Sequence, residues 1–100
     1  MPADFMGWRS DGRCVLIECK DVDRPHLPLG KSPGLSQFQV QAAALSANKA
    51  IYLVVWKRAD DAVVFPAATH LGQKSVEASR LTWHRLANLR QLLGSWIMSG

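Results

Sequence analysis

The chain has 100 residues, of which 48% are apolar and 20% charged, with 12 Lys and Arg against 8 Asp and Glu. The length predicts one small domain over residues 1–100, and the apolar share excludes a disordered chain. The longest apolar run covers residues 51–56, far below the ~18 residues of a membrane span. Because the N-terminus also lacks a signal-peptide pattern, we expect a soluble protein of the cytoplasm. The net charge of +4 suits a phosphate-rich partner.

The first part of the chain predicts a β-hairpin followed by a loop. Residues 4–8 and 13–20 favour strands because they are rich in apolar and β-branched residues. Gly12 ends the turn between them, where a left-handed conformation is needed. A turn centred on Asp11 places Asp4 directly opposite Glu18. Residues 21–34 contain three prolines and two glycines, so we expect an irregular loop there.

The middle of the chain predicts a helix and then a buried strand. Ser36 and Gln39 match the capping-box pattern, so a helix follows Ser36 and continues to about Asn48. Its expected core stripe has three apolar residues at helical spacing, Phe38, Ala42 and Leu45. The run over residues 51–57 does not alternate, which favours a strand buried on both faces. The helix between this strand and the strand at residues 13–20 predicts a crossover within one sheet.

The last part of the chain predicts short elements and a long terminal helix. After a turn at residues 58–61, residues 62–65 favour a strand, and residues 67–71 favour a short helix before Gly72. Residues 82–97 predict an amphipathic helix with an apolar stripe, Leu86, Leu89, Leu93, Trp96 and Ile97. The predicted fold class is therefore α/β, a mixed β-sheet flanked by helices.

Three charged residues of the hairpin do not suit a purely structural sheet. Glu18 interrupts an apolar strand, and Lys20 follows on the same face because strand side chains alternate. The Cβ atoms of Asp4 and Glu18 are expected to lie about 5 Å apart. Two carboxylates this close repel each other, and a divalent cation between them would remove the repulsion. The alternative is a salt-bridged surface in which the two acids pair with Lys20 and Arg13.

These residues stand in a pattern similar to the signature of the PD-(D/E)xK nuclease superfamily. Pro2, Ala3 and Asp4 are followed, thirteen residues later, by Glu18, Cys19 and Lys20. More narrowly, the chain resembles the RecU-type Holliday junction resolvases. Further similar features follow in the family's order, namely Asp4-Phe5-x-Gly7, Leu27-Pro28-Leu29 before a helix, Gln39 in its first turn, an apolar strand from Ile51, and Lys74-Ser75-Val76. The VRR-type nuclease domains, which share the acidic pair, Glu-x-Lys and Leu-Ser-x-x-Gln, are the second choice.

The resemblance implies a restriction-endonuclease-like fold and a Mg²⁺-dependent DNA endonuclease that uses metal-activated water. It implies that Mg²⁺, or Mn²⁺ as a substitute, binds to Asp4, Glu18 and the backbone carbonyl of Cys19. It also implies Lys20 as the catalytic lysine and Gln39 as a catalytic-site residue supplied by the helix. Gln39 fits equally well as the reciprocal residue of the capping box.

The same resemblance implies branched DNA as the partner, in a bacterial or phage-infected cell. It implies a homodimer, since a four-way junction offers two symmetric scissile strands. Four basic side chains are candidates for DNA contacts, Lys20, Arg24, Lys31 and Lys74. The family normally carries an N-terminal helix and a stalk before its first Asp, and we expect both to be missing here. A general repair or restriction-like nuclease and a non-catalytic DNA-binding module with this fold are the alternatives.

Other candidate sites give weaker signals. His26, His70 and His84 show no metal-ligand spacing, so we expect ordinary surface or packing roles. Cys14 and Cys19 are expected to be buried thiols. The tryptophans are expected in the core rather than as base-stacking residues; they are Trp8, Trp56, Trp83 and Trp96.

Overall fold

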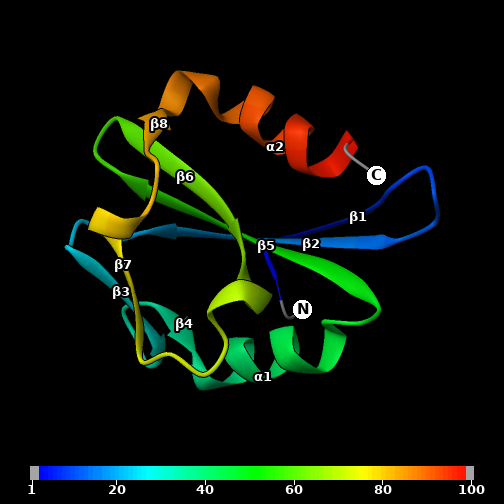
Figure 1. Ribbon diagram of the computed structural model, residues 1–100, viewed down its shortest axis with the longest axis horizontal. Coiled ribbons are helices and arrows are strands. Elements are labelled where there is room, and N and C mark those ends of the chain that lie inside the picture. Colours follow the sequence, from blue (N-terminus) through cyan, green and yellow to red (C-terminus); the bar gives the residue numbers. More distant parts are fainter. Residues whose placement is uncertain (1–2, 99–100) are drawn as a thin grey trace.

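The computed structural model describes residues 3–98, which form an α/β fold in three layers (Figure 1). The central layer is a five-stranded mixed sheet with the order β1-β2-β5-β6-β8. Its strands are β1 (Phe5–Trp8), β2 (Cys14–Asp21), β5 (Ala50–Arg58), β6 (Asp61–Pro66) and β8 (His84–Arg85). Helix α2 (Leu89–Met98) covers one face. Helix α1 (Gln37–Ser46) and a three-stranded sheet cover the other.

The smaller sheet has the order β4-β3-β7. Its strands are β3 (His26–Gly30), β4 (Leu35–Ser36) and β7 (Ser75–Glu77). Three short 3₁₀ helices complete the fold, η1 (Ala67–His70), η2 (Ala78–Arg80) and η3 (Leu86–Asn88). The short helix expected over residues 67–71 is therefore a 3₁₀ turn. Neither α-helix in the described range 3–98 is long and apolar enough to cross a membrane.

The hairpin and the crossover confirm the sequence prediction. Strands β1 and β2 are antiparallel with Phe5 opposite Ile17, the register that the sequence predicts, and Asp4 directly precedes this pair in the chain. Gly12 has φ 86° in the connecting turn, which glycine adopts without strain. Strands β2 and β5 are parallel neighbours, with α1 between them in the chain.

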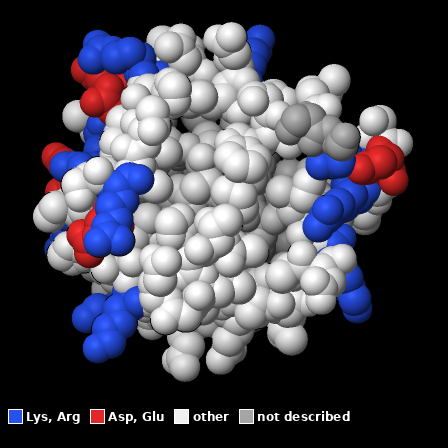
Figure 2. Space-filling view, in the orientation of Figure 1, with Lys and Arg blue, Asp and Glu red and all other residues white. Residues whose placement is uncertain are grey.

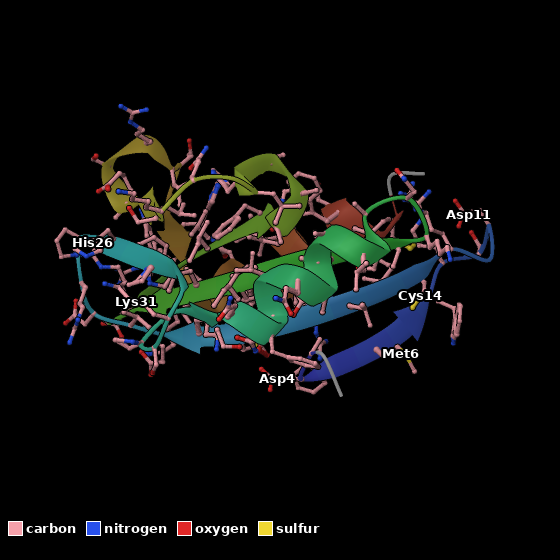
Figure 3. The ribbon with its side chains drawn as sticks, turned by 90° about the horizontal axis from the view of Figure 1, so that it is seen from below. Asp4, Met6, Asp11, Cys14, His26 and Lys31 are labelled. Atoms are coloured by element: carbon pink, nitrogen blue, oxygen red, sulfur yellow. The ribbon has the colours of Figure 1, made fainter. Side chains whose placement is uncertain are left out.

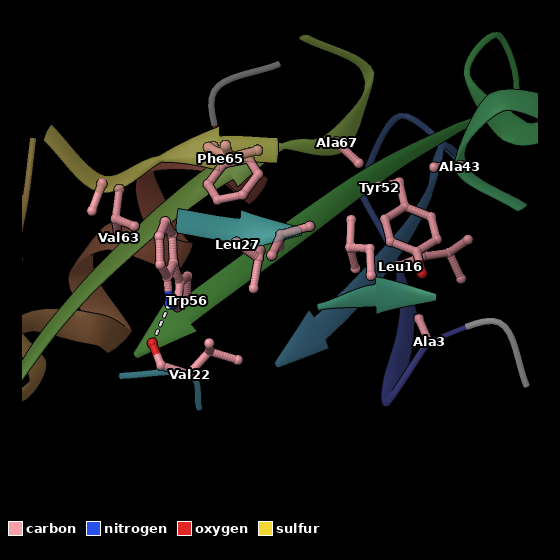
Figure 4. Packing of buried hydrophobic residues seen from close by; sticks show 14 of the residues in the cluster. Ala3, Leu16, Val22, Leu27, Ala43, Tyr52, Trp56, Val63, Phe65 and Ala67 are labelled. Atoms are coloured by element: carbon pink, nitrogen blue, oxygen red, sulfur yellow. Dashed lines mark hydrogen bonds between the residues drawn. The ribbon is translucent and has the colours of Figure 1, made fainter. Parts of the chain in front are cut away.

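The core side chains of β5 alternate between two apolar layers. Tyr52, Val54 and Trp56 face α1 and the smaller sheet, whereas Leu53 and Val55 face α2. All five are buried, so this strand is covered on both faces as predicted. Figure 4 shows the α1-side layer, in which the Trp56 indole N–H donates to the Val22 carbonyl at 2.8 Å.

The predicted core stripe of α1 is wrong for Phe38 and Leu45, whereas its third member, Ala42, is partly buried against the core. Phe38 is 64% exposed and Leu45 is 84% exposed, whereas Ala43 is fully buried against the sheet. Gln39 and Ala43 are four residues apart and therefore share one face of the helix. The small Ala43 side chain lets the helix approach the sheet closely enough for Gln39 to reach Glu18. This close approach turns the larger apolar side chains toward solvent.

The prediction of an irregular loop over residues 21–34 is also wrong, because this segment contains β3. Leu27 is fully buried, so the loop is anchored in the core. Strand β3 can contain Pro28 because no hydrogen bond to either neighbouring strand requires an N–H at this position. In the antiparallel pair of β3 with β7, Leu29 supplies the bond to the Lys74 carbonyl at 2.9 Å. Strand β4 begins opposite Leu29, after the proline.

The terminal helix is shorter than the predicted range of 82–97, since α2 begins at Leu89. The preceding residues pair with the edge of the central sheet, where Arg85 lies opposite Asp61. The Leu86 N–H donates to the Asp60 carbonyl at 2.6 Å. The backbone here bonds to β6 and to the turn before it. These tertiary hydrogen bonds, and not the helical sequence pattern, determine the conformation of residues 84–86. Four residues of α2 pack on the sheet, Leu89, Leu92, Leu93 and Ile97.

The tryptophans divide between core and surface. Trp56 is fully buried, and the Trp83 ring packs edge-on against it with centroids 5.0 Å apart. Trp8 is 68% exposed and Trp96 is 38% exposed, so the expectation of a core role is wrong for these two.

Candidate active site

The candidate site lies where β2 extends beyond its neighbour β1. The pairing of β1 ends with Phe5 opposite Ile17, while β2 continues to Asp21 alongside β5. Alternation along β2 directs Glu18 and Lys20 toward the layer that contains α1. The sheet thus presents two charged side chains beside the N-terminal turn of a helix.

Glu18 is the centre of this site. It is 3% exposed and is the one charged side chain that is buried among residues 3–98. The Gln39 side-chain amide donates a hydrogen bond to Glu18 Oε2. The Lys20 ammonium Nζ lies 3.7 Å from the same oxygen. The hydrogen bond from Gln39 and the ion pair with Lys20 act on the same oxygen and together orient the buried carboxylate.

Asp4 joins the site from the start of the hairpin. Its Oδ2 accepts a hydrogen bond from the Cys19 backbone N–H at 2.9 Å. In a strand, the N–H and C=O of one residue point to the same side. The Cys19 carbonyl therefore faces the edge at which Asp4 lies. Figure 3 shows Asp4 at the start of β1, far from Asp11 at the tip of the hairpin.

The two carboxyl groups have opposite pKa shifts. Burial, together with the hydrogen bond with Asp4, raises the pKa of Glu18 to about 7 against the opposing effect of Lys20. The Cys19 N–H and the same carboxyl contact lower the pKa of Asp4. Near neutral pH, the pair therefore retains a proton in a large share of the molecules. Such shared protonation marks a place where a cation can replace the proton.

Gln39 completes the capping box and also contacts Glu18. Its side-chain oxygen accepts from the Ser36 backbone N–H at 3.0 Å, while the Ser36 hydroxyl accepts from the Gln39 N–H at 3.2 Å. The capping box is thus complete. An amide carries both an acceptor and a donor, so its nitrogen is still able to bind Glu18. The helix cap itself aims Gln39 at the carboxylate.

Tyr52 is a neighbour of the pair that sequence reasoning missed. It is buried in β5, and burial, together with the charges of Glu18 and Asp4, raises its pKa to about 12. Its hydroxyl therefore stays protonated over the physiological range. No sequence signal marks Tyr52, because it stands in a continuous apolar run that reads as core.

The four candidates for DNA contacts do not form one group. Lys20 is in the site, whereas Arg24, Lys31 and Lys74 are exposed elsewhere on the surface. Lys74 bonds through its carbonyl to Leu29, on the β7 side of the smaller sheet. Figure 3 shows Lys31 beside the end of β3, away from Asp4.

The structure agrees only in part with the alternative prediction, a salt-bridged surface in which the two acids pair with Lys20 and Arg13. Lys20 does lie within ion-pair distance of Glu18, but Glu18 is buried and not on a solvated face. Arg13 makes no ion pair with Asp4 or Glu18 in the part of the chain that the structure describes. Its backbone N–H donates to Asp11 instead.

The donor set fits Mg²⁺ or Mn²⁺. Two carboxylates and one backbone carbonyl are oxygen ligands, and Mg²⁺ commonly retains several waters besides one or two carboxylates. Within residues 3–98 there is no group of three or more His, Cys, Asp and Glu side chains that could hold a metal ion. A site built here would therefore need water to complete its coordination. Pro2, the first residue of the motif, lies outside the described residues.

The remaining candidates take ordinary roles, with one correction. Cys19 is exposed and Cys14 is half-buried, so the expectation of two buried thiols is wrong. The Cys19 thiol lies on the α2 side of the sheet, opposite the face of Glu18. His70 packs edge-on against Phe65, with ring centroids 5.0 Å apart.

Comparisons with protein-family models, with curated proteins and with solved structures give no match to this chain.

Proposed function

We propose that this chain is a Mg²⁺-dependent DNA endonuclease of the Holliday junction resolvase type, built on a restriction-endonuclease-like fold. One observation carries the proposal. Three side chains gather at the buried carboxylate of Glu18. Gln39, which is 21 residues away in the sequence, and Lys20 contact Glu18 itself, and Asp4 accepts a hydrogen bond from the N–H of the next residue, Cys19.

Each of these residues has a definable task. Asp4, Glu18 and the Cys19 carbonyl would hold the ion. Once bound, the ion supplies Lewis-acid stabilisation and lowers the pKa of a water molecule. Lys20, with Nζ 3.7 Å from Glu18, is placed to orient the attacking water or to stabilise charge on the phosphate. Gln39 is a positioning residue, because it acts through Glu18.

The Cys19 N–H contributes by keeping Asp4 ionised. An Asp4 ligand with a lowered pKa beside a Glu18 that titrates near neutral pH would give the site affinity for a cation. Glu18 would give up its proton in order to act as a ligand.

We further propose branched DNA as the substrate, in the cytoplasm of a bacterial or phage-infected cell, and a homodimer as the active form. The outer strand β1 supports the dimer. It has no charged residue and exposes three large apolar side chains, Phe5, Met6 and Trp8. Outer strands of this kind are prone to pair with another strand. Pairing of two copies through β1 would be symmetric, as a junction requires. Loss of the dimer on Met6→Lys, measured by light scattering, would support this arrangement.

Cleavage assays test the function directly. Labelled four-way junctions, duplexes and single strands are each incubated with the protein and Mg²⁺, Ca²⁺ or EDTA. We expect cleavage of the junction in Mg²⁺ alone, because Ca²⁺ coordinates more loosely and does not position the water as Mg²⁺ does. Cleavage that survives EDTA would overturn the mechanism. DNA binding without cleavage of any substrate would favour the non-catalytic alternative.

A further inference from the structure

A cleft of about 520 Å³ lies at the outer edge of the smaller sheet, across that sheet from the acidic pair. Strand β7 forms its floor, and η1, η2 and the turn after η1 form its walls. The polar residues that line it include His70, Lys74, Ser75, Glu77 and Arg80. Since β7 is the outer strand, the cleft follows a strand edge.

Positive charge predominates in this cleft. Lys74 and Arg80 are exposed, and neither forms an ion pair within residues 3–98. The one acid, Glu77, accepts a hydrogen bond from the Ser75 hydroxyl at 3.0 Å. Two unpaired cations on the walls of one cleft repel each other, and an anion between them removes that cost. In Figure 2, Lys and Arg side chains lie along the margins of the face, including the left margin, where Figure 1 places β3 and β7.

Contacts within the chain hold other parts of the cleft wall in place. The His70 Nδ1 lies 3.2 Å from the Gln73 side-chain oxygen, and its ring packs against Phe65. The Lys74 carbonyl is fixed by the Leu29 N–H. The cleft therefore has a defined backbone, with flexible cationic side chains at its rim. A backbone phosphate is the kind of ligand that such a rim contacts.

The smaller sheet links the cleft to the acidic pair. Ser36 caps the helix that carries Gln39, and it lies opposite Gly30 in β3. Ser75 of the cleft lies opposite Pro28 on the other side of β3. Two strand spacings and two residues along the strand separate Ser36 from Ser75 by about 12 Å. At ~3.4 Å per nucleotide, this corresponds to three or four nucleotides along a helix axis.

We propose that this cleft binds a backbone phosphate of the nucleic acid, with Lys74 and Arg80 as its contacts, a few nucleotides from the acidic pair. The proposal rests on the proposed function, because it takes DNA as the partner. It adds Arg80, which no sequence motif singles out, to the DNA contacts, and it separates Lys74 from the site of Lys20.

The test is DNA binding in EDTA, where cleavage plays no part. Anisotropy of a short fluorescein-labelled duplex is measured as a function of salt for the parent, Lys74→Gln, Arg80→Gln and the double variant. Matched controls are Lys49→Gln and Arg90→Gln, which remove exposed cations outside the cleft. We expect each cleft variant to bind about fivefold more weakly and to lower the log–log salt slope by about 1. The double variant should lower the slope by about 2, and the controls should match the parent.

The outcomes separate the cleft from the nuclease. Cleft variants that bind like the parent and the controls would overturn the cleft and leave the nuclease proposal standing. If the cleft variants show the expected weaker binding but the parent cleaves no DNA in Mg²⁺, the result would support the cleft proposal and overturn the nuclease proposal. A parent that binds no DNA would overturn both. Charge-retaining Lys74→Arg and Arg80→Lys should bind like the parent, and equal melting temperatures confirm that all variants fold.

Discussion

The two faces of the central sheet differ in what they bury. The α2 face is closed by aliphatic side chains alone, with Leu53 and Val55 at its centre. The α1 face has a similar apolar core around Trp56, but near the end of β2 it encloses the carboxylate of Glu18. Burial of a carboxylate lowers the stability of the folded state, whereas burial of a leucine raises it. The comparison indicates that one face mainly stabilises the fold, whereas the other accepts a cost in stability that the proposed metal site would explain.

The largest expected effect separates activity from stability on the α1 face. Glu18→Gln keeps the shape of the side chain but removes its charge, so the proposed metal site would lose a ligand. We expect cleavage to fall by about 10³-fold or more. The melting temperature should stay the same or rise, because a buried charge and its repulsion with Asp4 are gone. Asp60→Asn, an exposed acid away from the site, is the control and should cleave like the parent.

The α2 face should respond in the opposite way. Leu53→Ala leaves a cavity in a fully buried position, which should lower the free energy of unfolding by about 3 kcal/mol. Leu45→Ala, on an exposed position, should change it by less than about 0.5 kcal/mol. Urea denaturation measures both. Cleavage per folded molecule should be unchanged in Leu53→Ala. A large loss of cleavage would contradict the claim that the α2 face contributes to stability and not to activity.

The pH dependence of stability should also trace to the α1 face. The pKa of Glu18 rises from 4.5 to about 7 on folding, so the folded state holds more protons over that range. Its contribution is therefore complete below pH 4.5 and is lost as the pH rises through 7. Asp4 has a lowered pKa and acts in the opposite sense at more acidic pH. Without metal, melting temperatures should fall between about pH 5 and 8. Glu18→Gln should flatten this slope, and an unchanged slope would contradict the assignment.

The smallest effect concerns the helix that carries Gln39. Ser36→Ala removes the side chain that caps α1, which should cost about 1 kcal/mol of unfolding free energy. The bond from Gln39 to Glu18 remains, so cleavage should fall by no more than about threefold. Gln39→Ala removes both contacts and should lower cleavage much further at a similar loss of stability. Equal cleavage by the two variants would show that Gln39 acts only as a cap.

The sequence predicts those parts of the fold in which local chemistry determines the geometry. Gly12 fixes the turn and therefore the register that brings Asp4 to Glu18. Ser36 and Gln39 define the start of α1. The convergence of the predicted site residues follows from these two local features. The close contacts of Glu18 with Lys20 and Gln39 agree with that prediction.

Other parts depend on tertiary contacts that no local pattern encodes. The orientation of α1 is set by the small Ala43 and by the bond to Glu18, so Phe38 and Leu45 are exposed despite their spacing. Strand β3 contains Pro28, a residue that normally argues against a strand, but its neighbour β4 begins after it. Leu86 lies in a helical pattern, yet its N–H bonds to the turn before β6.

Metal binding tests the central claim most directly. Calorimetric titration of the parent with Mn²⁺ at a pH just below 7, where more than half of Glu18 is protonated, should show saturable binding with release of protons, because Glu18 must lose its proton to act as a ligand. Asp4→Asn and Glu18→Gln should each abolish or strongly weaken this binding, while Asp60→Asn should retain it. Absence of saturable binding to the folded parent, or undiminished binding to both site variants, would contradict the assignment of Asp4 and Glu18 as a metal site.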